Sequence, residues 1–412
     1  MSQVKVGIDK IRVWPASLAL PMDELCRARG RSPEEARDVL MVDERSVNPP
    51  WEDPVTMAVN AANAMLTDEE RASVRLLLVC SESGVDQEKP LSVWVHRYLG
   101  LDSRCRNLEV KHACYSGTGA LGLASSFIAS GAAGRGARAL VITTDQSRMH
   151  FGKPWELVMG ACSSALLVSA EPRLLELELG KSGVYTREVM DDLCRPTSRV
   201  EQGNSETSLL SYLEALDSAV PAYIEAVGER IGYDYFKKNV YHVPFGGMTL
   251  RASRRALTHF GDYTRAEAQA LWESKTKPSL AFVRRMGGTY ASSTFAALLG
   301  LIARSNDLRS GDRIGMFSYG SGSCSEMYSG LLGPAFQEVA AEANLEGLLD
   351  ERHRIGVRDY EECERERVCY IDAGDFETSI DGLGGWYARR YGGRRLLTYR
   401  GAKDYYRRYE WS

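Results

Sequence analysis

Short apolar runs alternate with longer segments of helical periodicity along most of the chain. Strands are predicted where apolar residues cluster or alternate with polar ones, at residues 4–13, 74–80, 105–110, 139–143, 165–168, 174–179, 239–242 and 313–317. Helices are predicted from apolar spacing or small-residue content at residues 55–66, 120–128, 209–230 and 294–303. Strands that alternate with helices favour an α/β fold with covered sheets.

Start signals mark two further helix boundaries. Ser32 would cap a helix whose first residue is Pro33, and Asp53 would cap one that begins at Pro54. No linker rich in Pro, Gly or Ser divides the chain into two parts. We therefore expect its halves to form one interlocked unit.

Composition narrows the class of protein. The 412 residues suffice for two domains or one large α/β unit, and 44% hydrophobic with 26% charged residues is typical of soluble globular proteins. A net charge of −4 gives no reason to expect nucleic acid or an acidic membrane as partner. The nine scattered cysteines include no CxxC pair, so neither a metal site nor a disulfide framework is indicated. Without a signal peptide or a spanning apolar run, the sequence predicts a cytoplasmic protein.

The C-terminal segment, residues 386–412, interleaves arginines with tyrosines and tryptophan. Such a stripe can bind single-stranded nucleic acid through charge and stacking. Alternatively, the same side chains pack a terminal hairpin onto the body of the protein. The acidic overall balance favours the packing interpretation.

Cys114 lies between a predicted strand and a helix of small residues. Gly117 and Gly119 would let the backbone turn sharply between the two elements. A cysteine on such a turn faces the positive end of the helix, which would lower the pKa of its thiol. Because free cysteines are usually buried and inert, the spacing alone leaves a nucleophile and a buried thiol equally open.

Two more reactive side chains follow predicted strands. Glu82 comes after the strand at 74–80, and His242 ends the strand at 239–242 beside Pro244. Taken singly, Glu82 fits a solvated loop carboxylate and His242 a core histidine. Functional side chains of α/β proteins gather where strands end, so together with Cys114 they suggest an acyl-transfer site.

Such a set would support carbon–carbon bond formation. A thiolate can accept an acyl group from a thioester, and a desolvated carboxylate can remove a proton α to the new thioester carbonyl. An imidazole can polarise a second carbonyl and protonate the alkoxide that forms. The segment from Ser318 to Ser323 offers backbone N–H groups for an oxyanion hole.

Four segments resemble the 3-hydroxy-3-methylglutaryl-CoA synthases in order and spacing: CSESGVD, KHACYSGTGAL, YHVPFGGM and GMFSYGSGSCSEMYSG. The resemblance implies a thiolase-type fold, with two pseudo-duplicated α/β halves in a five-layered αβαβα arrangement, and a homodimer. It places an N-terminal half with the nucleophilic cysteine at residues 1–172. The C-terminal half, with the histidine and the basic aromatic tail, would span residues 173–412.

Within that family the chain is similar to the branch that initiates β-branching in polyketide biosynthesis. Phe245 to Met248 follow the histidine where mevalonate-pathway synthases carry lysines suited to coenzyme A. The resemblance implies donor and acceptor acyl carrier proteins, with substrates on phosphopantetheine or coenzyme A and no bound cofactor. Two alternatives stay open: a mevalonate-pathway synthase that uses acetyl-CoA and acetoacetyl-CoA, and a catalytically silent docking protein of an assembly line.

The resemblance also assigns roles to residues. Cys114 would carry the acyl group, Glu82 would be the base and His242 would bind the acceptor ketone, with the N–H groups of Cys114 and Ser321 forming the oxyanion hole. Substrate contacts would involve Phe245, Gly246, Gly288, Tyr290 and Tyr319. Independently of the resemblance, Arg31, Arg251, Arg254 and Arg255 would contact carrier protein or phosphopantetheine through charge-assisted hydrogen bonds, or they form a solvated helix face.

One position departs from the family pattern. Gly288 stands where a family asparagine is expected, in the segment from Arg284 to Tyr290. The glycine would remove a side-chain donor and open space in the site. A neighbouring Thr289 or a water can substitute for the donor, or the site can accept an acyl group larger than acetyl.

Overall fold

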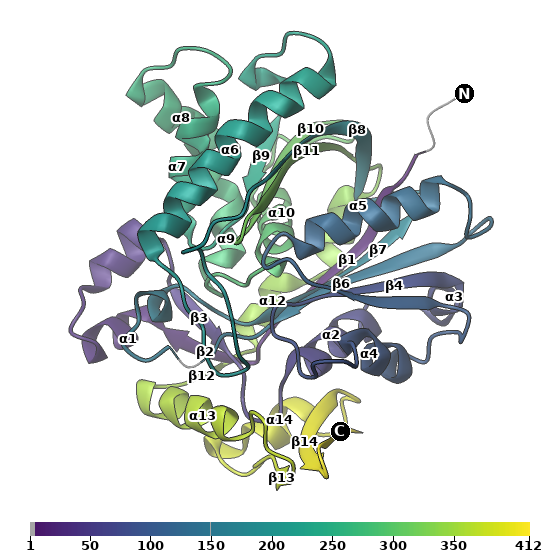
Figure 1. Ribbon diagram of the computed structural model, residues 1–412, viewed down its shortest axis with the longest axis vertical. Helices are drawn as coiled ribbons and strands as arrows, with labels where there is room; N and C mark the ends of the chain where they lie inside the picture. Colours follow the sequence, from purple (N-terminus) through teal and green to yellow (C-terminus); the bar gives the residue numbers. More distant parts are fainter. Residues whose placement is uncertain (1–4, 149) are drawn as a thin grey trace.

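A nine-stranded sheet runs through the molecule, which is described by a computed structural model over residues 5–148 and 150–412 (Figure 1). The strand order is β5-β4-β6-β7-β1-β8-β11-β10-β9. The bounds are β1 Gly7–Pro15, β4 Val74–Cys80, β5 Arg106–Val110, β6 Arg138–Asp145, β7 Cys162–Ser169, β8 Leu175–Thr186, β9 Lys238–Tyr241, β10 Arg313–Gly320 and β11 Cys324–Leu332. Each predicted strand overlaps one of these, although Val4, at the start of the first prediction, lies outside the described residues.

The sheet consists of two parts with the same pattern. In the first part β4 and β6 are parallel, β6 pairs antiparallel with β7, and β7 pairs antiparallel with β1. In the second part β9 and β10 are parallel, β10 pairs antiparallel with β11, and β11 pairs antiparallel with β8. Pairing of Gly7 with Glu176 and of Ile8 with Leu175 joins the two parts. The expected pseudo-duplication is confirmed, and β4 corresponds to β9.

Helices form three layers around the two parts of the sheet. Side chains on β4 alternate between the layers: Leu76 and Leu78 contribute to the middle core, whereas Leu77 and Val79 contribute to the outer one. Helices α5 and α10 fill the middle, α2 and α4 cover the first part, and α6 and α7 cover the second. Their bounds are α2 Pro54–Asn63, α4 Leu91–Leu99, α5 Ser116–Ala129, α6 Ser205–Val227, α7 Gly246–Leu257 and α10 Ser292–Arg304. The five-layered αβαβα arrangement is therefore confirmed.

The chain after β11 returns to the first part of the sheet (Figure 1). Its elements are α11 Phe336–Glu342, α12 Leu345–Asp350, β12 His353–Arg354, α13 Val357–Cys369, β13 Phe376–Glu377, α14 Trp386–Tyr391, β14 Leu397–Lys403 and β15 Tyr406–Trp411. The later elements, from α13 to β14, lie at the bottom of the view in Figure 1. Strands β14 and β15 form an antiparallel hairpin, and the Asn60 side chain on α2 hydrogen-bonds the backbone of Leu397. Arg407 and Tyr409 bind Asp53, the N-cap of α2. These contacts confirm the packed hairpin. The division between residues 172 and 173 falls between β7 and β8 and stays a prediction.

Shorter elements complete the chain: β2 Leu18–Pro21, α1 Met22–Ala28, β3 Glu44–Val47, α3 Asp68–Ser73, α8 Arg265–Lys275 and α9 Leu280–Val283. Asp53 caps α2 in a reciprocal arrangement with Thr56, as its position before Pro54 predicted. The helix expected after Ser32 is only a short π-helical turn, Glu35–Leu40, which ends where Met41 adopts a φ of 55°. None of the helices in residues 5–148 and 150–412 combines the length and apolar character that a membrane crossing requires.

Candidate active site

Glu82, Cys114 and His242 line one cavity of about 290 Å³. Glu82 follows β4, Cys114 precedes α5 and His242 follows β9. Because β4 and β9 are corresponding strands, the pseudo-duplication brings the carboxylate and the imidazole to equivalent ends of the two parts. The Sγ of Cys114 lies 3.5 Å from Oε1 of Glu82. The three side chains that the sequence singled out thus meet at one place.

The backbone presents Cys114 differently from the sequence-based expectation. The turn depends on Ala113, whose φ is 41°, and not on Gly117 or Gly119, which both lie inside α5. A Cβ at position 117 would lie 2.6 Å from Thr143 Cγ2, so this glycine lets α5 approach β6 closely. The expectation that Gly117 and Gly119 form the turn is therefore wrong.

The electrostatic surroundings of Cys114 also differ from the sequence-based expectation of a lowered thiol pKa. Burial, followed by the neighbouring Glu82 carboxyl, raises the pKa of the Cys114 thiol well above its ordinary value. The lowered thiol pKa expected from the start of the helix is therefore wrong for the free protein. The thiol must transfer its proton as it attacks, and Glu82 is within reach.

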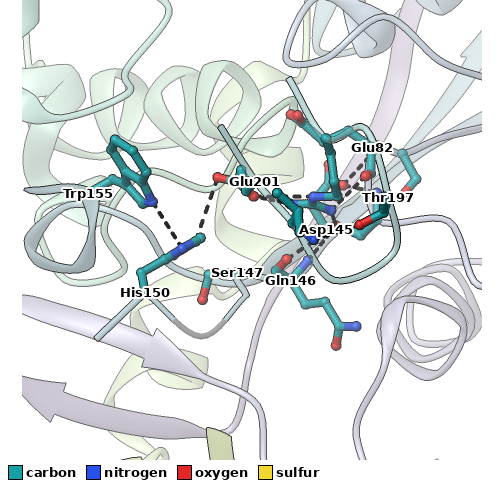
Figure 2. A network of polar contacts seen from close by, with 12 residues as sticks. Glu82, Asp145, Gln146, Ser147, His150, Trp155, Thr197 and Glu201 are labelled. Carbon is teal, nitrogen blue, oxygen red and sulfur yellow. Dashed lines mark hydrogen bonds and ion pairs between the residues drawn. The ribbon is translucent and has the colours of Figure 1, made fainter. Parts of the chain in front are cut away.

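Glu82 is held from its backbone. Its N–H donates to Oδ1 of Asp145 at 2.9 Å, and its carbonyl oxygen accepts from Nη1 of Arg195 at 2.7 Å. Burial and the charge of Asp145 raise the pKa of Glu82 to about 8. Figure 2 shows Glu82 beside Asp145 and Thr197. A carboxyl group with this pKa can both give and take a proton near neutral pH.

His242 is buried and neutral. Its Nδ1 lies 3.0 Å from Oγ of Ser293, and the ring of Tyr212 stacks on it with centroids 6.3 Å apart. The Tyr212 hydroxyl donates to the His242 carbonyl at 2.9 Å. Burial lowers the pKa of His242 to about 3, so the ring meets a substrate as an uncharged imidazole.

Most of the predicted substrate contacts line the cavity as well. Phe245, Gly288, Tyr290, Tyr319 and Ser321 are among its lining residues. Gly246 is not among them, since it begins α7 and packs toward Met41, where a Cβ would lie 2.7 Å from Met41 Cβ. The prediction of a substrate contact at Gly246 is not supported by this geometry.

Gly288 does not open the space that its missing side chain suggested. A Cβ there would lie 2.2 Å from the carbonyl oxygen of Pro244 and 3.3 Å from that of Val158. The Gly288 N–H donates to the Val158 carbonyl at 2.6 Å, and its own carbonyl accepts from Gly160. Backbone therefore fills the position, and the glycine is needed for close approach of two segments.

The four predicted arginine contacts divide into two groups. Arg251 is exposed and lines the cavity, and within the described part of the chain it has no hydrogen-bond or ion-pair partner. The other three bind groups of their own chain: Arg31 pairs with Glu35, Arg254 with Gln269 and Arg255 with Asp217. Arg251 is thus the one of the four that is placed to meet a ligand in the cavity.

Sequence reasoning missed several residues around the site. Asp145 ends β6, and Arg195 and Glu201 come from the loop between β8 and α6. The position of Asp145 at a strand end was a usable signal. The loop residues gave none, because they have no periodicity and no neighbouring motif.

The comparisons with known proteins agree with this geometry. Residues 261–387 match the family model described as hydroxymethylglutaryl-coenzyme A synthase C terminal. The polyketide biosynthesis 3-hydroxy-3-methylglutaryl-ACP synthase PksG of Bacillus subtilis is 37% identical over 371 residues, 87% of this chain and 87% of that protein. The hydroxymethylglutaryl-CoA synthase of Enterococcus faecalis is 30% identical over 363 residues, 86% of this chain and 90% of that protein.

Solved structures give the same result. The HMG synthase of the curacin biosynthetic pathway superposes with a TM-score of 0.93 at 34% identity, covering 99% of this chain and all of that one. MvaS in complex with 3-hydroxy-3-methylglutaryl coenzyme A superposes with a TM-score of 0.88 at 29% identity, covering 99% of each chain. The chain belongs to the hydroxymethylglutaryl-CoA synthase family and has its thiolase-type fold. It is an enzyme of the acyl-transferring, condensing kind that defines this family.

Proposed function

We propose that the enzyme condenses an acetyl group carried on Cys114 with the β-keto group of a polyketide intermediate on an acyl carrier protein. Hydrolysis of the enzyme thioester then leaves a carboxymethyl branch and initiates β-branching. The observation that carries this proposal is the meeting of Glu82, Cys114 and His242 on one cavity. The similarity to PksG and to the curacin HMG synthase supports the choice of substrates.

In the first step, the Cys114 sulfur attacks the carbonyl carbon of the acetyl thioester. Its proton passes to the Glu82 carboxylate, which lies within hydrogen-bond distance, and from there to the departing phosphopantetheine thiolate. The carbon–sulfur bond to the carrier breaks as the bond to Cys114 forms. We assign the backbone N–H groups of Cys114 and Ser321 to the negative oxygen of the intermediate, because both residues line the cavity.

In the second step, the Glu82 carboxylate removes a proton from the methyl group of acetyl-Cys114. The resulting enolate carbon attacks the β-keto carbon of the acceptor, whose oxygen becomes an alkoxide. A neutral His242 that carries its hydrogen on Nε2 polarises this ketone by donating a hydrogen bond, and the alkoxide takes up the proton that Glu82 removed from the methyl group, so both side chains return to their starting states. Ser293 supports this tautomer, since its hydroxyl lies beside Nδ1 and can donate to it while accepting from the Val243 N–H. Water then cleaves the thioester at Cys114.

The opening of the cavity suits a substrate carried on a phosphopantetheine arm. Arg251 is exposed, lines the cavity and has no ion-pair partner among the described residues, so it is suited to bind the phosphate of such an arm. The curacin HMG synthase has been solved with apo, holo and acetyl donor-ACP. We extend this donor class to the present enzyme and propose a carrier protein for the acceptor also.

We further propose a cytoplasmic homodimer. The cysteines are all unpaired, which fits a reducing compartment. Strand β5 lies at the edge of the sheet, and near it Leu108 on β5 and Leu123 on α5 are 55% and 60% exposed. Pairing of two β5 edges would cover both side chains. Light scattering after gel filtration should give twice the mass of the chain.

Turnover with matched substrates tests the choice of carrier. We expect product formation from acetyl and acetoacetyl groups on carrier proteins to exceed, in kcat/KM, that from the same groups on coenzyme A. Equal or faster turnover of acetyl-CoA with acetoacetyl-CoA would indicate a mevalonate-type synthase. A protein without condensing activity on either pair, although correctly folded, would contradict the proposal.

A further inference from the structure

A largely buried ion pair lies beside the backbone of Glu82. Arg195 and Glu201 belong to the loop between β8 and α6, and both line the cavity. Their side chains are 11% and 10% exposed, and Nη2 of Arg195 lies 2.5 Å from Oε2 of Glu201. Because a buried ion must be compensated, neither partner is stable there without the other. The loop is thereby tied to one position.

The other N–H groups of Arg195 donate hydrogen bonds to the segment that carries Glu82. Nη1 donates to the carbonyl oxygen of Glu82 at 2.7 Å and to Oγ of Ser83 at 3.4 Å, while Nε donates to Glu201 at 3.2 Å. The N–H of Glu82 is held in turn by Asp145. Both backbone polar groups of Glu82 are therefore fixed by charged side chains.

Glu201 also lies near His150, which contacts Trp155 of the cavity wall. The second carboxylate oxygen of Glu201 lies 3.6 Å from Nε2 of His150, whose Nδ1 accepts from Nε1 of Trp155 at 3.0 Å. Since Nδ1 accepts, the hydrogen of the neutral ring is on Nε2, which lies near Glu201 but beyond hydrogen-bond distance. Figure 2 shows Glu201 between His150 and the group around Glu82. Trp155 itself lines the cavity.

We propose that Arg195, held by Glu201, is a positioning residue of the condensation: it fixes the backbone of Glu82 and provides the positive charge that keeps its carboxyl group competent as a base. This inference rests on the proposed function, in which Glu82 removes the α-proton. Neither residue touches the reacting atoms. Their effect is exerted through the place and the charge of Glu82.

The charges that face Glu82 come from several elements and act in opposite directions. Asp145 at the end of β6 and Glu201 disfavour its ionised form, whereas Arg195 favours it, and the Cys114 thiol donates a hydrogen bond to it. Tyr290, before α10, is also close enough to interact with the carboxylate and is itself protonated. Removing Arg195 should therefore raise the pKa of Glu82, while neutralising Glu201 should lower it.

Three variants separate positioning from mere stability. Arg195→Met removes the positive charge but keeps a side chain of similar length. Arg195→Lys keeps the charge but loses the planar guanidinium group that bonds Glu82 and Glu201 at once. Glu201→Gln removes only the negative charge of the partner. Arg199→Gln is the matched control, because Arg199 lies in the same loop but pairs with exposed Asp372 away from Glu82. Each is assayed for acetylation of Cys114 by intact mass, and for the pH dependence of single-turnover condensation of the acetylated enzyme.

We expect all four variants to accept the acetyl group. The midpoint of the pH profile should move upward for Arg195→Met and downward for Glu201→Gln, and should stay in place for Arg199→Gln. If the midpoint moves upward by about one pH unit, the rate of condensation falls about tenfold at pH values below the midpoint. Arg195→Lys should lie between wild type and Arg195→Met.

Shifts in the same direction for Arg195→Met and Glu201→Gln, or no shift in either, would overturn the inference. If Arg195→Met does not fold, the pH profiles of Arg195→Lys and Glu201→Gln are compared instead. Midpoints that move in opposite directions support the inference, and midpoints that move in the same direction or not at all overturn it. Failure of the wild-type enzyme to become acetylated or to condense would instead contradict the proposed function. The pH dependence of Cys114 alkylation by iodoacetamide, read by peptide mass, would then report the charge at Glu82 without any turnover.

Discussion

The Sγ atom of Cys114 lies 3.5 Å from Oε1 of Glu82, although 32 positions separate the two residues in the chain. Burial and Glu82 raise the pKa of the Cys114 thiol, whereas the hydrogen bond from that thiol lowers the pKa of Glu82, which burial and Asp145 raise more strongly. The free enzyme therefore holds a protonated thiol next to a carboxyl group whose pKa is about 8. Because these two groups share one cavity, their ionisation changes the stability of the fold as well as the reactivity of the site.

Glu82→Gln should stabilise the fold in a pH-dependent way. The pKa of Glu82 in the folded protein, about 8, lies above the ordinary value of 4.5. The favourable contribution of this group to the free energy of unfolding is therefore complete below about pH 4.5 and is lost as the pH rises toward 8. The variant has no charge to bury. Its Tm should exceed that of wild type by an amount that grows from about pH 4.5 to about pH 8 and then levels. A difference in Tm that is constant with pH would contradict the burial of an ionisable Glu82.

Ser293→Ala should slow the condensation without affecting acetylation. The hydroxyl of Ser293, 3.0 Å from Nδ1 of His242, is the group that keeps the ring hydrogen on Nε2. Loss of one hydrogen bond of this kind should reduce the single-turnover rate of condensation about tenfold. The acetylation rate, measured by mass, serves as the internal control. Equal losses in both steps would show that Ser293 acts only on the structure.

Gly288→Asn should not restore a more family-like site. The new Cβ would lie 2.2 Å from the Pro244 carbonyl oxygen, a contact that only a backbone shift can relieve. We expect a Tm lower by several degrees and weaker condensation, because Pro244 is two residues from His242. Gly122→Ala is a suitable control, since a Cβ there meets no atom within 4 Å. A Gly288→Asn enzyme of wild-type stability and higher activity would contradict the backbone-filled position.

Arg251→Ala should weaken the use of carrier-bound donors. Arg251 lines the cavity without a partner in the described residues, whereas Arg255, on the same helix, is engaged by Asp217. We expect about a tenfold rise in KM for acetyl carrier protein in Arg251→Ala, and a smaller change in Arg255→Ala. The effect should shrink as salt is added. An unchanged KM in Arg251→Ala would remove this residue from the donor site.

Much of the fold and the three central residues could be predicted from the sequence. The predicted segment at 74–80 coincides with β4, and Glu82 and His242 were singled out because reactive side chains follow strands. The match of four separated motifs to one family made these positions specific. Strand patterns and short motifs depend on neighbouring residues in the chain, so a single sequence is enough to predict them.

Other features depend on contacts between distant segments. The thiol environment of Cys114 was mispredicted because burial beside Glu82 outweighs the start of α5. Gly288 looked like a missing side chain, yet the carbonyl of Pro244 occupies the place where one would lie. Arg195, paired with Glu201, reaches the Glu82 carbonyl from a loop without periodicity. Spacing along the chain records none of these approaches.

Trapping the acyl-enzyme tests the central assignment most directly. Wild type and Glu82→Gln are mixed with acetyl carrier protein and an acetoacetyl acceptor, quenched in acid and digested for peptide mass spectrometry. We expect one acetyl group on Cys114 in both proteins. It should form more slowly in Glu82→Gln, where water must take the thiol proton, and should then accumulate there because condensation falls by about 10²–10⁴-fold without the base. Acetylation at another residue, or condensation by Glu82→Gln at the wild-type rate, would contradict the roles of Cys114 and Glu82.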